Sequence, residues 1–289
     1  MMKRSLLLGI VLAVCSLGIV KGQTVSDSLA IVSAQWKIES PQKGIIHKYV
    51  SIPQLYQLPQ SISLIEIDPG AGLKVGVTVS DKMRETSRMA SEQGAIAAIN
   101  GSYFDMKRGN SVCFLKVDRQ VVDTTTLGEF ARRVTGAVSI RKGKMKIISW
   151  NRQIEKQYKG KKGIVLASGP LMLKDGRYYD WSLCEKDFIR TKHPRSAVAL
   201  TKDGKILFIT VDGRFPKYAG GVSIPELAHL IRILGGKDAI NLDGGGSTTL
   251  WTMGLLTTPA TISVSPIVEN VRYLISFMFM TNIFMTNLF

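Results

Sequence analysis

The strongest candidate for chemistry is a glycine-rich run that follows an apolar segment late in the chain. It reads Asp243-Gly244-Gly245-Gly246-Ser247-Thr248. Three successive glycines let backbone N–H groups approach a ligand closely, and such groups can form an anion-binding nest. Ser247 and Thr248 add hydroxyl groups and Asp243 adds a carboxylate, but no lysine follows as in a Walker loop. The run predicts a phosphate-binding site, and a tight glycine turn is the alternative.

Three further motifs carry polar side chains at the ends of apolar segments. In Asn100-Gly101-Ser102-Tyr103-Phe104-Asp105, Asn100 can bond a sugar hydroxyl and the aromatic rings can stack on a sugar face. Arg195 follows His193-Pro194 and presents a planar donor fork that matches phosphate. Asp212-Gly213-Arg214 offers a second carboxylate beside a cation, although Asp-Gly is first of all a turn signal.

Other catalytic classes find less support in the sequence. None of the three histidines lies in a triad context, and the chain has no Gly-x-Ser-x-Gly elbow. Cys113 and Cys184 follow the expected leader, and they either form one bridge or remain two buried thiols. No Cys/His cluster has zinc-ligand spacing. A divalent metal shared by the carboxylates stays possible, because spacing does not decide it.

Two stretches that share one design are expected to position the glycine-rich run and the Asn100 motif. Ser80 can cap a helix that runs to about Gln93, and the strand 95–99 follows a glycine stop. Further on, Ser223 and Glu226 form a capping box with proline in the first turn. That helix ends at a glycine pair and leads into the strand 239–242. Loops at the ends of buried strands are where sites tend to lie.

The remaining pattern predicts an α+β domain with a mixed, largely antiparallel sheet and a few helices. Turns at 141–143 and 203–204 join hairpin strands. We expect one domain over 61–277, an irregular N-terminal segment over 23–60 that is punctuated by prolines, and an atypical tail over 278–289. No function is assigned to the tail.

The N-terminus predicts export. Residues 1–22 have a basic start, a short apolar run and a small-residue cleavage site, as in a secretory signal peptide. A lipoprotein signal ending at Cys15 is the less favoured alternative, and the apolar run is short for a stable membrane span. The formal net charge of +16 falls to +13 without the leader. This excess of positive charge indicates an anionic partner and a solvated basic face equally well. Nucleic acid is disfavoured as a partner, because the chain is expected to be exported and no recognised nucleic-acid-binding motif occurs in it.

Taken in order, these motifs resemble the phosphodiester glycosidase family. The resemblance runs from about residue 64 to residue 250 and rests on 98–104, 195–199, 211–214, 221–234 and 238–247. Ser102-Tyr103 replaces the more usual Gly-Phe of the family, and its Arg-rich closing motif is only loosely matched at 269–273.

The resemblance implies hydrolysis of a sugar-1-phosphodiester of the N-acetylglucosamine type or of a related phospho-glycan. It implies that Arg195, Arg214 and the Gly244–Gly246 amides bind phosphate, that Ser247 and Thr248 contact its oxygens, and that Asn100 positions the sugar. Asp243 and Asp212 are then the carboxylates that activate water or stabilise the transition state. A non-catalytic envelope protein that binds glycan with the same loops is the alternative. Oligomeric state is left open.

Overall fold

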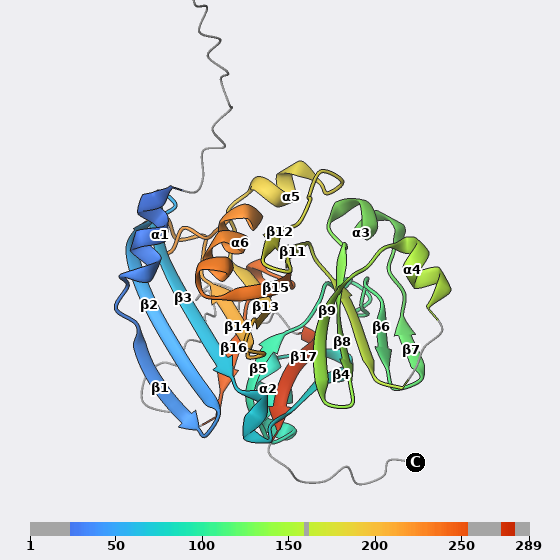
Figure 1. The fold of residues 1–289 in the computed structure, drawn as a ribbon. Helices are drawn as coiled ribbons and strands as arrows, with labels where there is room; N and C mark the ends of the chain where they lie inside the picture. The colour runs from blue at the N-terminus through green and yellow to red at the C-terminus, as the bar shows by residue number, and fades with distance from the viewer. Residues whose placement is uncertain (1–23, 159–161, 254–272, 281–289) are drawn as a thin grey trace, which may run out of the picture.

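The structure is a computed structural model that describes residues 24–158, 162–253 and 273–280 (Figure 1). The expected signal peptide, the lipobox cysteine and residues 281–289 of the expected tail lie outside the described residues. None of the helices in the described part of the chain is long and apolar enough to cross a membrane. The described chain starts with α1 (Val25–Val32), whose N-terminus is a capping box of Thr24 and Asp27.

The largest sheet has eight strands, and its neighbouring strands all pair antiparallel. Their order across the sheet is β1-β2-β3-β14-β13-β15-β11-β12. The strands are β1 (Lys37–Gln42), β2 (Ile45–Leu55), β3 (Leu58–Ile67), β11 (Leu171–Lys174), β12 (Arg177–Tyr178), β13 (Arg195–Thr201), β14 (Ile206–Val211) and β15 (Gly236–Asn241).

Both faces of this sheet are buried at its centre, which explains the unbroken apolar runs of its central strands. Successive side chains of a strand point to opposite faces. Leu64 and Leu207 therefore enter one core cluster, whereas their neighbours Ile65 and Phe208 enter another. A strand covered on both faces needs apolar residues at successive positions, and β14 is buried along its whole length.

Three helices cover one face of the large sheet (Figure 1). The longest, α6 (Ile224–Ile233), starts at the predicted capping box of Ser223 and Glu226. α1 contacts β2 and α6, and α5 (Lys186–Arg190) also contacts α6. The other helices are α2 (Thr86–Glu92), α3 (Leu127–Arg132) and α4 (Arg152–Gln157), and short 3-10 turns occupy Pro69–Ala71 and Gly245–Ser247.

Two smaller antiparallel sheets pack against the opposite face. Ile96 and Val138, one from each small sheet, lie in the same buried cluster as Ile65 and Phe208 of the large sheet. The small sheets have the orders β7-β6-β10-β8-β9 and β16-β5-β17-β4. Their strands are β4 (Lys74–Arg84), β5 (Ala95–Asn100), β6 (Leu115–Val117), β7 (Gln120–Asp123), β8 (Gly136–Arg141), β9 (Lys144–Ser149), β10 (Ile164–Ser168), β16 (Leu250–Thr252) and β17 (Tyr273–Met280).

The α+β class, the single domain and the predicted hairpins are confirmed, whereas two local predictions are wrong. The segment 23–60 is not irregular, because it contains α1, β1, β2 and most of β3. Its prolines do not break these strands: Pro41 lies on an edge strand and Pro53 at a register shift, which are positions that tolerate proline. Ser80 lies inside β4 instead of capping a helix. The pairing of β4 with the distant β17 overrides the local helix signal.

The two cysteines of the described chain, Cys113 and Cys184, are both free and buried. Burial raises the pKa of the Cys113 thiol to about 12. His229 is packed as a core histidine, because its ring nitrogens lie 2.7 Å from the Tyr56 hydroxyl and 3.0 Å from the Ser28 hydroxyl. These groups support the fold.

Candidate active site

The two similarly built stretches of the sequence meet in space. β5 ends at Asn100 and β15 ends at Asn241, and the loops that follow them are hydrogen-bonded to each other. The backbone N–H of Asp243 donates to the Gly101 carbonyl at 3.0 Å, and Asn100 Nδ2 donates to the Asp243 carbonyl at 2.8 Å. The glycine-rich run and the Asn100 motif therefore form one loop cluster, at the junction of two sheets.

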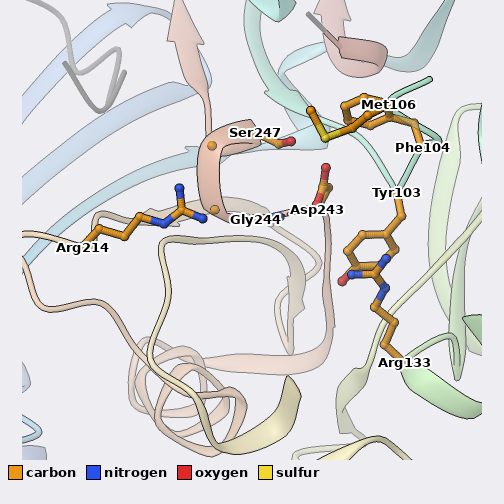
Figure 2. Close-up of a pocket in the computed structure, with 10 residues that line it drawn as sticks. Tyr103, Phe104, Met106, Arg133, Arg214, Asp243, Gly244 and Ser247 are labelled. Atoms are coloured by element: carbon orange, nitrogen blue, oxygen red, sulfur yellow. Dashed lines mark hydrogen bonds between the residues drawn. The ribbon is translucent and has the colours of Figure 1, made fainter. Parts of the chain in front are cut away.

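A cavity of about 350 Å³ opens beside this cluster (Figure 2). One carboxylate, two guanidinium groups and several apolar side chains line it. The lining residues are Tyr103, Phe104, Met106, Arg133, Arg214, Asp243, Gly244, Gly245, Gly246 and Ser247. In Figure 2, Arg214 lies on one side of Asp243 and the glycine-rich turn, and Phe104 and Met106 lie on the other. Arg133 lies beside Tyr103 on the same side as Phe104 and Met106, so a cation stands on each side of Asp243 and the apolar side chains lie on one side only.

Asp243 is the carboxylate of the cavity, and its surroundings favour its protonated form more than water does. Its Oδ1 accepts from the Gly244 N–H at 2.9 Å. Burial is the largest influence and raises the pKa of Asp243 to about 6, although a hydrogen bond with the Ser247 side chain and the charge of Arg133 act to lower it. Such a displaced carboxyl pKa in a cavity is typical of groups that exchange protons with substrate.

Arg133 forms one wall of the cavity and is rigidly held. Its Nε and Nη2 bind both carboxylate oxygens of Glu129, at 2.6 and 3.1 Å. Its guanidinium carbon lies 3.5 Å from the centre of the Tyr103 ring. The Tyr103 hydroxyl in turn donates to the Gly169 carbonyl at 2.6 Å and accepts from Asn241 Nδ2 at 2.7 Å. The arginine is therefore fixed through both of its neighbours.

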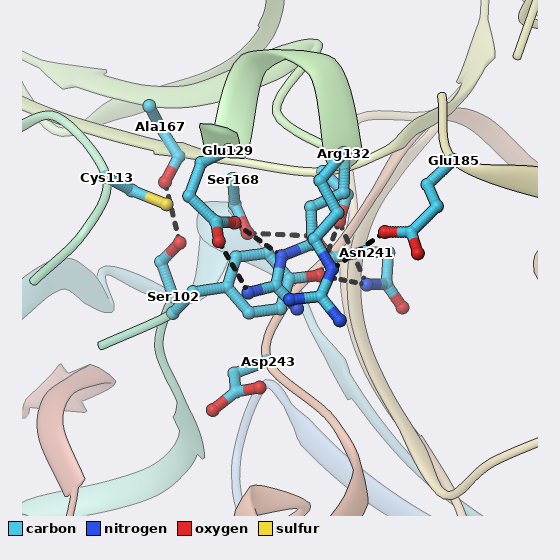
Figure 3. Close-up of polar contacts among 12 residues, drawn as sticks. Ser102, Cys113, Glu129, Arg132, Ala167, Ser168, Glu185, Asn241 and Asp243 are labelled. Atoms are coloured by element: carbon cyan, nitrogen blue, oxygen red, sulfur yellow. Dashed lines mark hydrogen bonds and ion pairs between the residues drawn. The ribbon is translucent and has the colours of Figure 1, made fainter. Parts of the chain in front are cut away.

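Polar contacts between the ends of β10 and β15 join the five-stranded sheet to the large sheet (Figure 3). Ser168, at the end of β10, donates to the Asn241 carbonyl at 2.9 Å. Ser102 donates to the Ala167 carbonyl at 2.7 Å. Arg132 pairs with Glu185 at 3.0 Å at the outer side of the network. All three sheets thus contribute to the support of the cavity, and none of them could form it alone.

Arg214 reaches the cavity from the loop after β14, in a conformation that is uncommon for a side-chain-bearing residue. Its φ of 70° is left-handed. Gly245 is also left-handed, with φ of 61°, and a Cβ added there would lie 2.9 Å from Arg214 Nη2. The middle glycine of the run therefore serves two needs: it permits the turn and it leaves room for the guanidinium.

Two residues that were predicted to bind substrate instead form hydrogen bonds within the protein. Asn100 is buried, and its Oδ1 accepts from the Ser196 hydroxyl at 2.7 Å and from the Thr249 N–H at 3.1 Å. Arg195 is also buried and donates to the backbone carbonyls of Val222, Phe188 and Thr191. Neither side chain lines the cavity. The predicted contacts of Asn100 with sugar and of Arg195 with phosphate are not supported by this geometry.

Other predicted site residues also lie outside the cavity lining or bond to groups of the protein. Asp212 does not line the cavity, and its Oδ2 accepts from the Ser61 hydroxyl at 2.6 Å. Thr248 is buried away from the lining. The N–H groups of Gly244 and Gly245 already donate, to Asp243 Oδ1 and to the Pro194 carbonyl. The anion nest that the glycines predict is therefore largely occupied by the protein's own acceptors.

Arg133 and Met106 are cavity residues that the motifs do not single out. In the sequence, Arg133 is one of many basic residues, and its spacing of four from Glu129 is the only local signal of a pairing. Met106 follows the aromatic pair Tyr103-Phe104, whose stacking on a sugar was predicted. The described residues contain no group of three or more His, Cys, Asp or Glu side chains arranged to hold a metal ion.

Comparison with solved structures shows the same fold in three proteins. The zebrafish N-acetylglucosamine-1-phosphodiester alpha-N-acetylglucosaminidase catalytic domain, auto-inhibited by its pro-peptide, matches with a TM-score of 0.65 at 18% identity, over 86% of this chain and 88% of that one. A hypothetical protein from Synechocystis has a TM-score of 0.61 at 15% identity, over 86% and 64%. A protein of Burkholderia pseudomallei K96243, described by its name as exported, has a TM-score of 0.57 at 13% identity, over 80% of this chain and 76% of that one.

Sequence comparison gives the family. The SPbeta prophage-derived uncharacterized protein YomE of Bacillus subtilis (strain 168) is 30% identical over 166 residues, which cover 55% of this chain and 24% of YomE. The chain thus spans about a quarter of the length of that relative. The family model described as phosphodiester glycosidase matches residues 93–271, more than half of the chain. The chain therefore belongs to the phosphodiester glycosidase family.

Proposed function

We propose that the chain is an exported glycosidase that hydrolyses the bond between a sugar's anomeric carbon and a phosphodiester oxygen. The observation that carries the proposal is the placement of one carboxylate with a raised pKa, Asp243, between two guanidinium groups in a single cavity. Family membership supports the reaction class. The N-terminal pattern and the name of the Burkholderia pseudomallei relative support export.

Asp243 acts as the base in this scheme. Above its pKa of about 6 it is ionised, and it accepts a proton from the water that attacks the anomeric carbon. The new bond joins the water oxygen to that carbon, and the bond to the phosphodiester oxygen breaks. The sugar leaves with a free hydroxyl and the phosphate leaves as a monoester. A phosphate is a good leaving group, so stabilising its charge matters more than protonating it.

Arg133 and Arg214 supply that stabilisation. Guanidinium groups match phosphate oxygens with paired donors. Glu129 occupies Nε and Nη2 of Arg133, so Nη1 is the nitrogen that this ion pair leaves for a ligand. Arg214 is exposed at the edge of the cavity and lies beside Gly245. A phosphate near the glycine-rich turn can therefore receive donors from both sides, while the apolar flank of Phe104 and Met106 receives the sugar face.

A non-catalytic glycan-binding protein is the second candidate, and one observation favours it. Asp243 is the only carboxylate among the residues that line the described cavity, whereas most glycosidases use two carboxyl groups. The leaving-group argument answers this, because a phosphodiester does not need the general acid that an ordinary glycoside needs. The two candidates differ in a single observable, namely turnover.

The test is release of N-acetylglucosamine from its benzyl 1-phosphodiester by the mature protein. We compare wild type, Asp243→Asn and the control Asp203→Asn, whose carboxylate is exposed at the β13–β14 turn. Loss of a general base lowers kcat by about 10²–10⁴-fold, so the first variant is expected to lose turnover and the second to keep it. A parallel series with chelator tests for a metal.

Binding of the diester without hydrolysis by folded wild-type protein would establish the binding protein instead. Full activity of Asp243→Asn would remove Asp243 from the mechanism even if the wild type turns over.

A further inference from the structure

Two short loops on opposite sides of the cavity carry features that a single sugar phosphodiester does not require. The first, the 104–111 loop, contributes Phe104 and Met106 to one flank, and the second, the 213–219 loop, contributes Arg214 to the other (Figure 2). Each loop continues beyond the cavity with exposed apolar and cationic side chains.

The 104–111 loop is closed and rigid, and its outer part is cationic. A β-bridge joins its two ends. Asp105 Oδ1 accepts from the backbone N–H groups of Lys107 and Arg108, at 2.7 and 3.0 Å. The only acid of the loop is thus engaged in shaping its turn, while Lys107 and Arg108 are exposed. Next to them, Met106 is 72% exposed although it also lines the cavity.

The 213–219 loop is likewise closed by hydrogen bonds and carries exposed cationic and apolar side chains. The Phe215 N–H donates to the Ala219 carbonyl at 3.0 Å, and the Ala219 N–H donates back at 2.7 Å. Lys217 is exposed and Tyr218 is 76% exposed. Single exposed apolar side chains are common on protein surfaces, and what distinguishes Met106 and Tyr218 is that both lie on loops that also contribute side chains to the cavity. Because the loop is fixed before binding, little conformational entropy is lost when it makes a contact.

We propose that the substrate is a polymer of phosphate-linked sugars that crosses the cavity from one loop to the other and is cut at internal bonds. The proposal rests on the proposed function and names its substrate class. The bond in the cavity lies between Arg133 and Arg214, and the next phosphates on either side meet the cations of the 104–111 and 213–219 loops. Met106 and Tyr218 offer apolar contacts to the sugars between these phosphates.

Cations also gather at the far end of the five-stranded sheet, and they provide the matched control. Arg141, Lys142 and Lys144 lie at the β8–β9 turn. β8 spans six residues, so this turn is roughly 20 Å along the strand from the end near Arg133. Removing two of these charges changes the net charge as much as removing one from each loop, without touching the proposed path.

The experiment compares a synthetic hexamer of N-acetylglucosamine-1-phosphate units with the benzyl 1-phosphodiester of N-acetylglucosamine. In the wild type, we expect a lower KM for the hexamer and early products of two to four sugars. The double variant Lys107→Ala/Lys217→Ala is expected to raise KM for the hexamer by roughly three- to ten-fold, the range for exposed charge contacts, and to leave the kinetics of the benzyl diester unchanged. The control Lys142→Ala/Lys144→Ala should leave both substrates unaffected.

Three results would overturn the proposal: equal KM values for the two substrates, release of single sugars only, or an equal loss in the control. Each of these leaves the proposed glycosidase activity intact, since the benzyl diester reports on that activity alone. Hydrolysis of neither substrate would refute the activity and the polymer together. Melting temperatures of both double variants confirm that the compared proteins are folded.

Discussion

Asp243→Asn is expected to stabilise the fold at neutral pH while it abolishes turnover. The pKa of this carboxyl is raised from 3.8 to about 6, so the folded protein holds its proton more tightly than the unfolded chain does. Below about pH 4 both states are protonated and nothing is lost. Between about pH 4 and pH 6 the stability falls as pH rises, and above pH 6 the whole cost of ionising this partly buried group is present.

The size of the effect follows from that displacement. A difference from 3.8 to about 6 corresponds to about 3 kcal/mol. Asparagine keeps an acceptor for the Gly244 N–H, but it replaces the second carboxylate oxygen with an NH₂ group and loses about 1 kcal/mol of hydrogen bonding. The variant should therefore gain about 2 kcal/mol at pH 7.5, which raises Tm by roughly 4–8 °C for a chain of this size.

Differential scanning calorimetry of both proteins at pH 4, 5, 6, 7 and 8 measures this gain. We expect the Tm difference to be zero or slightly negative at pH 4 and to grow across pH 5 and 6. Asp203→Asn, at an exposed turn, should show no such growth. A variant that is no more stable than wild type at pH 8 would refute the argument, because the carboxylate would then carry no cost of burial.

Three further predictions test the surroundings of Asp243. Ser247→Ala removes a hydrogen bond that lowers the pKa of Asp243, so the acidic limb of the kcat/KM profile should move upward by roughly 0.5–1 pH, as measured with a buffer series; an unmoved limb would exclude Asp243 as its source. Gly245→Ala places a Cβ 2.9 Å from Arg214 Nη2, and the displaced guanidinium should raise KM roughly ten-fold in steady-state assays. Gly204 is also left-handed but has open space around it, so equal effects of the control Gly204→Ala would mean that backbone strain alone is responsible. Asn100→Ala leaves the buried Ser196 hydroxyl and Thr249 N–H without their acceptor, and we expect about 3 kcal/mol of destabilisation in denaturant melts, with a native-like melt as the contrary result.

The sequence was sufficient for those elements whose signals are local. The capping box of α6, the β8–β9 and β13–β14 hairpins, and the strands before the two polar loops are all set by residues close to one another in the chain. The extent of β4 was not predictable in this way, because its partner β17 lies almost 200 residues later. The prolines of the N-terminal segment led to the wrong prediction of an irregular segment for the same reason, because whether a strand tolerates proline depends on its place in a sheet.

The residues that the motifs single out coincide only in part with the residues that line the cavity. Asp243 and Arg214 are among the lining residues. Arg195 and Asn100 have side chains of suitable chemistry, yet buried backbone and side-chain groups already use them. Residue type and spacing show what a side chain could bind, whereas its actual partners depend on tertiary packing. Arg133 illustrates the converse, since packing against Tyr103 brings an ordinary arginine into the cavity.

The position of β5 between β16 and β17 has a consequence for the order in which the cavity forms. β5 leads into the loop that carries Tyr103 and Phe104, and both of its neighbouring strands come from the last forty residues of the chain. Contacts between segments this far apart in sequence form late and slowly in folding. We therefore expect the wall of the cavity that carries Tyr103 and Phe104 to form only after β16 and β17 have paired with β5.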